Sequence, residues 1–392
     1  MSWRAIMAGV AALLIAAVVV RNAGVAQFAE TDPRNAARIW PSHPASELWL
    51  GLTQIGLSAR ERKPVTRATL ALVRDAARKA PLAPEPFLVR GVEGQLAGDQ
   101  RLATQAFAAA RLRDGRSIPA RYFLAEQYFR GGDVSRGLRE TAILARMVPN
   151  GVTSLAPFVA SYAKDPRTRP HLKALFRTDP ALEQAALTTL ATDARNTDLI
   201  LGLATPSRTA PQWTEMLLRS QVAAGDYALA RQTWARLAHV APTPDSIFDP
   251  EFKGSAAPQP FNWTLTSSTA GLAEPQGGGR LHVLFYGQED GLLAGQLLVL
   301  SPGRYRLAMR VDGEAARAAT LKWTVSCVRS GQVLLSLALS DAKRAAQGVQ
   351  FDVPATDCGA QNLQLAGSAP ELPQQADVTV SGLSLVRVPG NG

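Results

Sequence analysis

A Gly-Asp dipeptide returns at a fixed interval in the first two thirds of this chain. Gly98-Asp99 and Gly132-Asp133 lie 34 residues apart, and each falls between two segments whose apolar residues have helical spacing. Gly225-Asp226 stands in the same context further along. A repeat of this length is typical of antiparallel helix pairs, which cannot bury their apolar faces alone and therefore stack on one another. The interval predicts an all-α solenoid.

Packing in such an array needs small residues where two helix backbones cross and bulky residues that fill the gap to the next pair. The residues that we assign to these packing positions are Gly91, Ala103, Phe107, Ala110, Ala230 and Trp234. Pro81, Pro149 and Pro242 follow the second helices of three units, where Pro ends a helix because it lacks the backbone N–H.

This pattern resembles the tetratricopeptide repeat (TPR) family over residues 50–149 and 211–242. Most units lack the first Trp of that family, and residues 150–210 are out of register although they also read as helices. The resemblance implies a concave groove that holds partner proteins, here other proteins of the cell envelope. A plain array of helical hairpins that repeats by chance is the alternative.

An apolar run without a charged side chain, Ala5 to Val20, lies near the amino terminus between Arg4 and Arg21. A membrane-spanning helix needs about 17 to 25 apolar residues, and flanking Arg side chains extend the usable length. We therefore expect residues 1–26 to be an uncleaved anchor, with residues 3–21 in the bacterial inner membrane and the bulk of the chain in the periplasm. A signal peptide cleaved after Ala26 and a buried soluble helix are the alternatives.

Basic side chains are concentrated in the front part of the chain. Residues 1–244 carry 31 basic and 19 acidic side chains, whereas residues 245–392 carry 11 and 13, for a net charge of +10 overall. A solvated Arg-rich surface is the favoured interpretation of this excess, and a surface for anionic lipid headgroups, an anionic polymer or an acidic partner is the alternative. Nucleic acid is not expected as a partner, because this part of the chain is expected outside the cytoplasm.

The pattern changes at Pro242-Thr243-Pro244, after which short alternating runs are separated by turn-forming residues. The expected strands are 261–266, 280–286, 292–300, 303–312, 320–328, 332–339, 348–353, 362–366 and 378–388. No helix long enough for a crossover separates them, which predicts an antiparallel β-sandwich of the jelly-roll kind. The succession of Phe261-Asn262-Trp263, Leu281 to Phe285 and Pro302 to Leu307 resembles carbohydrate-binding modules.

The predicted sandwich contains a possible disulfide and a group of aromatic residues that are candidates for glycan binding. Cys327 and Cys358 are the only cysteines of the chain, and in an oxidising compartment we expect them to form a disulfide, with two buried thiols as the alternative. Flat aromatic rings match the apolar face of a sugar, so exposed aromatics would form a platform for a glycan. The candidates for this platform are Trp263, Tyr286, Tyr305 and Trp323, but packing in the core is the favoured interpretation for each, because alternation puts some of them on the inward face.

No motif for catalysis, for a metal or for a cofactor was found in the sequence. His43, His171, His239 and His282 lie in different elements, and there is neither a nucleophile elbow nor a phosphate-binding loop. Asp249, Glu251, Glu289 and Asp290 are the carboxylates that would supply a glycosidase pair. We expect a protein that is not an enzyme and has no cofactor.

These observations predict three parts: a membrane anchor or signal segment at 1–26, a TPR-like helical domain at 27–244, and a β-sandwich domain at 245–392. The expected function is a membrane-anchored periplasmic scaffold, in which the helices bind partner proteins and the sandwich binds a glycan or packs on a neighbouring subunit. This layout resembles accessory proteins of bacterial exopolysaccharide and O-antigen assembly. A pure protein-interaction scaffold without sugar binding and a carbohydrate-active enzyme are the alternatives.

Overall fold

The computed structural model describes residues 3–206, 211–241, 243–313 and 320–389. Pro242, one of the predicted helix-ending prolines, lies outside the described residues, as does the side chain of Arg4. The chain divides into two compact units, Met1–Leu155 with Asp165–Leu175 and Ala156–Lys164 with Phe176–Gly392. The last helices of the front part therefore belong to the same compact unit as the β-sandwich.

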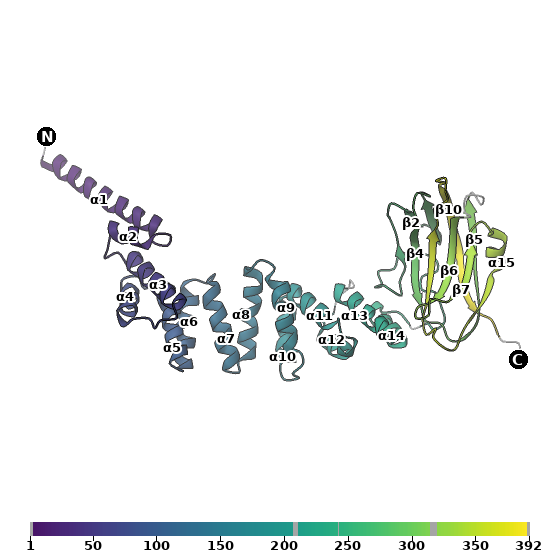
Figure 1. Ribbon diagram of the computed structural model, residues 1–392, viewed down its shortest axis with the longest axis horizontal. Coiled ribbons are helices and arrows are strands. Elements are labelled where there is room, and N and C mark those ends of the chain that lie inside the picture. Colours follow the sequence, from purple (N-terminus) through teal and green to yellow (C-terminus); the bar gives the residue numbers. More distant parts are fainter. Residues whose placement is uncertain (1–2, 207–210, 242, 314–319, 390–392) are drawn as a thin grey trace. The chain divides into compact units, whose positions relative to one another are not determined.

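The predicted fold class is confirmed: an apolar N-terminal helix, an α-helical array and an antiparallel β-sandwich follow one another along the chain (Figure 1). The helices before the sandwich are α1 Trp3–Phe28, α2 Pro33–Ile39, α3 Pro44–Arg60, α4 Arg67–Lys79, α5 Glu85–Leu96, α6 Gln100–Arg113, α7 Ile118–Arg130, α8 Val134–Met147, α9 Gly151–Tyr162, α10 Arg169–Thr178, α11 Pro180–Leu190, η1 Ala194–Asn196, α12 Thr197–Leu203, α13 Gln212–Ala223 and α14 Tyr227–Ala238.

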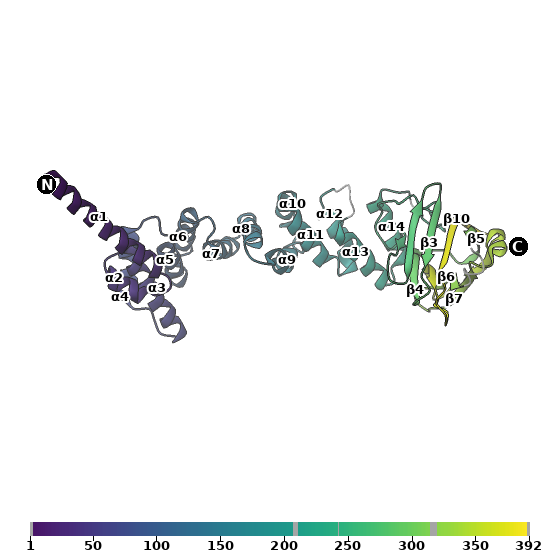
Figure 2. The ribbon, with the colours of Figure 1, turned by 90° about the horizontal axis from the view of Figure 1, so that it is seen from above.

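The Gly-Asp dipeptides form the turns inside the helix pairs. Gly98 and Gly132 both have a backbone φ of +77°, a conformation that costs little only for Gly. The following Asp then caps the next helix: Asp99 accepts a hydrogen bond from the backbone N–H of Leu102, and Asp133 accepts one from Arg136. Each dipeptide thus ends one helix and begins its partner, and consecutive helices α5 to α8 lie against one another (Figure 2).

Gly91 of α5 lies against the ring of Phe107 in α6. A Cβ atom at Gly91 would lie 2.7 Å from Cζ of that ring, so the absence of a side chain is what lets the two helices meet here. Phe107 is fully buried and also stacks on Phe123 of α7, with ring centroids 5.0 Å apart. One ring therefore connects three successive helices.

The sandwich consists of two five-stranded sheets with the strand orders β1-β4-β9-β6-β7, called sheet A, and β2-β3-β10-β5-β8, called sheet B. All pairings are antiparallel. The strands are β1 Thr264–Leu265, β2 Gly271–Gln276, β3 Arg280–Phe285, β4 Gly291–Leu298, β5 Gly303–Gly313, β6 Leu321–Cys327, β7 Val333–Ala338, β8 Val349–Val353, β9 Gln361–Gly367 and β10 Ala376–Arg387.

Two elements of the sandwich were not predicted. Strand β2 contains Pro275, which cannot donate to a ladder, but it lies at the edge of sheet B where that loss is tolerated. Helix α15, Ala342–Gln347, is a short segment between β7 and β8 that begins at the cap Asp341. Neither segment has the alternation or the length by which strands and helices are predicted from a sequence.

The contact of Gly91 with Phe107 predicts opposite effects for two glycine substitutions. Gly91→Ala is expected to lower the free energy of unfolding by about 1–3 kcal/mol, because the added methyl group overpacks the α5–α6 contact. Gly56→Ala in α3 is the matched control, since its Cβ would meet nothing within 4 Å. It is expected to stabilise by about 0.5–1 kcal/mol through helix propensity. Thermal unfolding followed by circular dichroism measures both, and shifts of the same sign would contradict the prediction.

Candidate functional site

Most of the aromatic residues proposed as a glycan platform lie in the core of the sandwich. Trp263 is 7% exposed, and Tyr305 and Trp323 are fully buried. The rings of Trp263 and Trp323 pack against each other at a centroid distance of 6.0 Å. Only Tyr286, at 37% exposed, reaches the surface. The predicted platform is therefore corrected: alternation turns Tyr305 of β5 and Trp323 of β6 inward, and Trp263, just before β1, packs on Trp323.

The polar atoms of two of these residues hold the structure together. The Tyr305 hydroxyl donates to the carbonyl of Ser301 at 2.8 Å, and Trp263 Nε1 donates to the carbonyl of Asp249 at 2.8 Å. Burial, with a contribution from the nearby Asp245 carboxylate, raises the pKa of Tyr305 to about 12. These hydrogen bonds attach the segment before β1 and the β4–β5 turn to the core.

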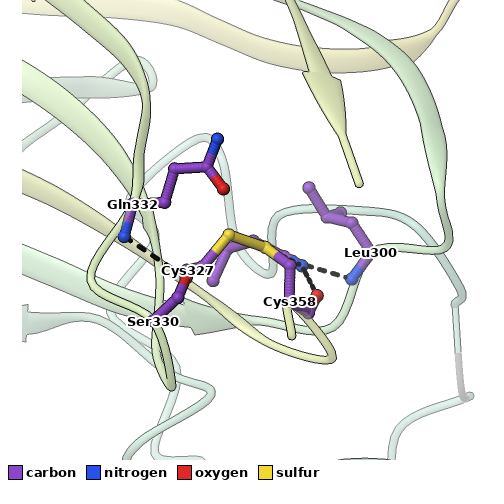
Figure 3. The surroundings of a disulfide bond; sticks show 6 residues. Leu300, Cys327, Ser330, Gln332 and Cys358 are labelled. Atoms are coloured by element: carbon purple, nitrogen blue, oxygen red, sulfur yellow. Dashed lines mark hydrogen bonds between the residues drawn. A yellow bond between two sulfur atoms is a disulfide. The ribbon is translucent and has the colours of Figure 1, made fainter. Parts of the chain in front are cut away.

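The predicted disulfide between Cys327 and Cys358 is present and joins the end of β6 to the loop before β9 (Figure 3). The side chain of Gln361 supports this loop: it donates to the Cys358 carbonyl at 2.6 Å and accepts from the backbone of Leu300 at 3.0 Å. Gln361 is fully buried, so both hydrogen bonds are shielded from water. The disulfide and this amide together fix the start of β9.

Within the second compact unit, helices α13 and α14 pack on the sandwich. Trp234 of α14 is 1% exposed and lies in one apolar cluster with Phe261, Leu297 and Ala360. Its indole N–H donates to the carbonyl of Pro258 at 2.7 Å. Trp234 and Ala230 were predicted to pack between repeats; the structure places both in this cluster, so they pack against the β-sandwich as well as within the helix pair.

The same contact contains a half-buried arginine. The guanidinium of Arg231 lies 4.4 Å from the centroid of the Trp234 ring and 5.4 Å from that of Phe261. Burial lowers the pKa of Arg231 to about 10. The side chain of Gln296 adds a second link, because it exchanges two hydrogen bonds of 2.9 Å with the backbone of Phe248, whose ring packs on Trp234 at 4.8 Å.

The packing of α13 beside sheet A leaves a groove of about 240 Å³. Its wall on the helix side carries Arg219 and Val222, and its floor is the outer face of sheet A. The residues that line the floor and rim are Pro260, Thr264, Leu292, Gly295, Gln296, Leu297, Val328, Asn362 and Gln364. Neither the wall nor the floor of the groove carries a carboxylate, so Arg219 gives the groove a positive charge.

One row of residues across the outer face of sheet A carries only neutral side chains, most of them polar. Thr264, Gly295, Gln364, Thr324 and Ser336 are successive cross-strand neighbours over all five strands of sheet A. In the adjacent row, Asn362 of β9 pairs with Ser326 of β6. In the described part of the chain no hydrogen bond engages the side chains of Asn362 and Gln364, which are half-buried. We call these two rows and the wall residue Arg219 the amide face.

The amide face was not predicted from the sequence, although the sequence contains one signal for it. In β9, Asn362 and Gln364 alternate with Leu363 and Leu365, which predicts that one side of this strand is polar. Which polar side chains of other strands lie beside them depends on the register, and α13 is more than a hundred residues away in sequence.

The predicted carboxylates are engaged in local structure and do not come together as one group. Asp249 accepts hydrogen bonds from the backbone N–H groups of Lys253 and Gly254, and Asp290 accepts one from Ala369. Glu251 pairs with the ammonium of Lys253, and Glu289 accepts from the hydroxyl of Thr269. Among the described residues, no cluster of three or more His, Cys, Asp or Glu side chains could hold a metal ion.

The residues assigned to helix packing are buried where the structure places them. Ala103 and Ala110 of α6 and Ala230 of α14 are fully buried, and Gly91 is also buried. Gly91 and Ala103 lie on the contact between the paired helices α5 and α6.

Comparison with known proteins gives partial likenesses only. No protein-family model and no curated protein matches this chain. Solved structures with partial similarity include the accessory secretory proteins 1, 2 and 3 of Streptococcus pneumoniae, at 12% identity and a TM-score of 0.25, over 38% of this chain and 100% of that one. Yeast Tom70 matches at 14% identity and a TM-score of 0.26, over 54% of this chain and 45% of that one.

The third similarity is to TmCBM61 in complex with beta-1,4-galactotriose, at 16% identity and a TM-score of 0.22, over 37% of this chain and 95% of that one. The match to Tom70 spans less than half of that protein's own length. At these TM-scores the likenesses carry no weight for function, which has to be inferred from the residues of this chain.

Removal of the disulfide is expected to weaken the sandwich. The double variant Cys327→Ser, Cys358→Ser should lower the free energy of unfolding by roughly 3–4 kcal/mol, because the bond closes a loop in the unfolded chain. Denaturant unfolding followed by tryptophan fluorescence measures the loss. Reductant should have the same effect on the native protein and none on the variant. Identical midpoints for the two proteins without reductant would refute the prediction.

Proposed function

We propose that this protein is a membrane-anchored scaffold of bacterial cell-envelope polysaccharide assembly. In this proposal α1 holds the chain in the inner membrane, the helical array docks partner proteins in the periplasm, and the amide face of the sandwich binds a glycan. The observation that carries the glycan part is the row of unengaged amides and hydroxyls on sheet A, in a groove bounded by α13.

The chemistry of the amide face suits a sugar. Each hydroxyl of a sugar both donates and accepts a hydrogen bond, and the side-chain amides of Asn362 and Gln364 offer both functions. Gly295 carries no side chain between the strands that hold Thr264 and Gln364, which leaves room for a ring above the sheet. The side chain of Leu292, 38% exposed, supplies an apolar surface at the rim.

The positions of the carboxylates favour a sandwich that binds a glycan without cleaving it. A glycosidase needs two carboxyl groups on either side of the scissile bond. The groove lining contains none, and Asp249, Glu251, Glu289 and Asp290 each have a partner in the sandwich. Polysaccharide handling by a non-catalytic subunit also accords with the separate helical array, which offers an extended surface for the proteins that would carry out the chemistry.

Retention of α1 is supported by the way in which its end is packed. Val25 is fully buried and Ala29 is 5% exposed, both in a cluster with Ala36 of α2. Cleavage after Ala26 would cut the helix between these two residues. The side chains of the described apolar residues from Val10 to Val20 are largely exposed, and α1 is long and apolar enough to cross a membrane.

The glycan site predicts a selective loss of binding. Asn362→Ala together with Gln364→Ala should weaken retention of the full-length protein on an immobilised envelope polysaccharide by roughly 10- to 50-fold, since each lost hydrogen bond is worth about 1 kcal/mol. Gln350→Ala, on an exposed position of β8 in sheet B, is the matched control and should bind as the native protein does. Affinity electrophoresis in gels that contain the polysaccharide gives the comparison.

If none of the envelope polysaccharides tested retains the native protein, the sandwich is not a glycan-binding module and the protein is a pure protein-interaction scaffold. Equal losses of polysaccharide binding in the double variant and in Gln350→Ala would show that the glycan binds elsewhere on the sandwich.

The packing of Val25 predicts that the amino terminus is not cleaved. Protein isolated from membranes should retain residues 1–26, which intact-mass spectrometry and N-terminal sequencing measure directly. An inhibitor of signal peptidase should leave this mass unchanged. A mature chain that begins at Gln27 would show that α1 is a cleaved signal.

A further inference from the structure

Helix α1 passes without a break from the apolar run into the folded first unit. The side chains of Leu13, Leu14 and Val20 are 64–73% exposed, whereas that of Val25 is fully buried. In Figure 1 the C-terminal end of α1 lies beside α2, and α3 follows directly. The change from exposed to buried occurs within five residues of one continuous helix.

The end of α1 is held by several contacts to α2 and to the start of α3. The guanidinium of Arg21 donates to the carbonyl of Ile39 at 2.8 Å and lies 5.0 Å from the centroid of the Trp40 ring. Asn22 Oδ1 lies 3.1 Å from Nε2 of His43. A Cβ at Gly24 would lie 3.2 Å from the side chain of Ile39, so the two helices are in close contact.

These contacts fix the distance between α2 and the hydrocarbon core of the membrane. An α-helix rises about 1.5 Å per residue, so Val25 lies roughly 7–8 Å beyond Val20. The headgroup layer on each side of the hydrocarbon core is about 5–8 Å thick. If the apolar run ends at the hydrocarbon boundary, then α2 and Trp40, which contact α1 between Arg21 and Val25, lie at the depth of the lipid headgroups.

The residues at this depth suit an anionic lipid surface. Arg34 and Arg38 are four residues apart on α2, exposed, and without a carboxylate partner among the described residues. Two carboxylates, Glu30 and Asp32, lie in the preceding turn, and Asp32 caps α2 through the N–H of Asn35. Together with Arg21 the cluster has a positive excess, and Trp and Arg are the side chains that membrane–water interfaces favour.

We propose that Arg21, Arg34, Arg38 and Trp40 form a headgroup-binding surface that takes the phosphate of anionic phospholipids. The inference rests on the proposed anchoring by α1 and adds that the first helices of the array rest on the bilayer. The lipid surface thereby limits the tilt of the first unit, since α2 is attached both to α1 and to the headgroups.

Site-specific photocrosslinking of the full-length protein in vesicles tests this surface. Trp40→p-benzoylphenylalanine is expected to crosslink phosphatidylglycerol in vesicles of phosphatidylcholine with one quarter phosphatidylglycerol. Tyr122→p-benzoylphenylalanine is the control, because Tyr122 of α7 is an aromatic residue in this unit that is 58% exposed, more than the half-buried Trp40, but is not attached to α1. Arg34→Gln and Arg38→Gln in the Trp40 variant should each lower the phosphatidylglycerol crosslink about fivefold.

Flotation of the vesicles separates the two proposals. Protein that floats with the vesicles but gives no lipid crosslink at position 40, or gives as much at position 122, overturns the headgroup surface and leaves the anchor intact. Protein that does not float overturns both. A crosslink at position 40 that is unaffected by the two Arg substitutions also contradicts the role of the arginines.

Discussion

The contact between Trp234 and the β-sandwich joins the two kinds of structure in this chain. A helical repeat cannot bury its apolar face alone, and the described residues between α14 and the first strand form no further helix pair. The sandwich takes that place: Phe261, Leu297 and Ala360 cover Trp234, and the carbonyl of Pro258 accepts its indole hydrogen bond. The position of α13 beside sheet A, and with it the groove over the amide face, follows from this contact.

The interior of the sandwich supports this contact from the other side. The disulfide and the buried amide of Gln361 fix the loop that carries Ala360, while Gln296 holds Phe248 against Trp234. Arg231 fills the remaining space with its guanidinium over two aromatic rings. Covalent, polar and apolar contacts therefore converge on one short helix. A buried polar group is tolerated in each case because it is hydrogen-bonded or lies against an aromatic face.

Features with a local physical cause were predictable. Gly98 and Gly132 mark turns because only Gly adopts their φ cheaply, and nine of the strands follow from alternation bounded by turn residues. Strand β2 was missed because Pro275 weakens its pattern. The prediction of an aromatic platform was wrong because alternation indicates that a strand has two faces but not which face is buried. Tyr305 and Trp323 point into the core, and the polar side chains that alternate with them along β5 and β6 point outward.

The sequence by itself determined the order of the parts, namely an apolar helix, a helical repeat and a run of antiparallel strands, since each rests on spacing within about forty residues. It also indicated the disulfide, because the chain has only two cysteines. Only the tertiary structure decided that Trp234 packs on the sandwich, that Arg219 borders a row of amides, and that Arg21 lies against Trp40. These contacts join residues far apart in the chain, so they depend on strand register and helix packing, which local spacing does not encode.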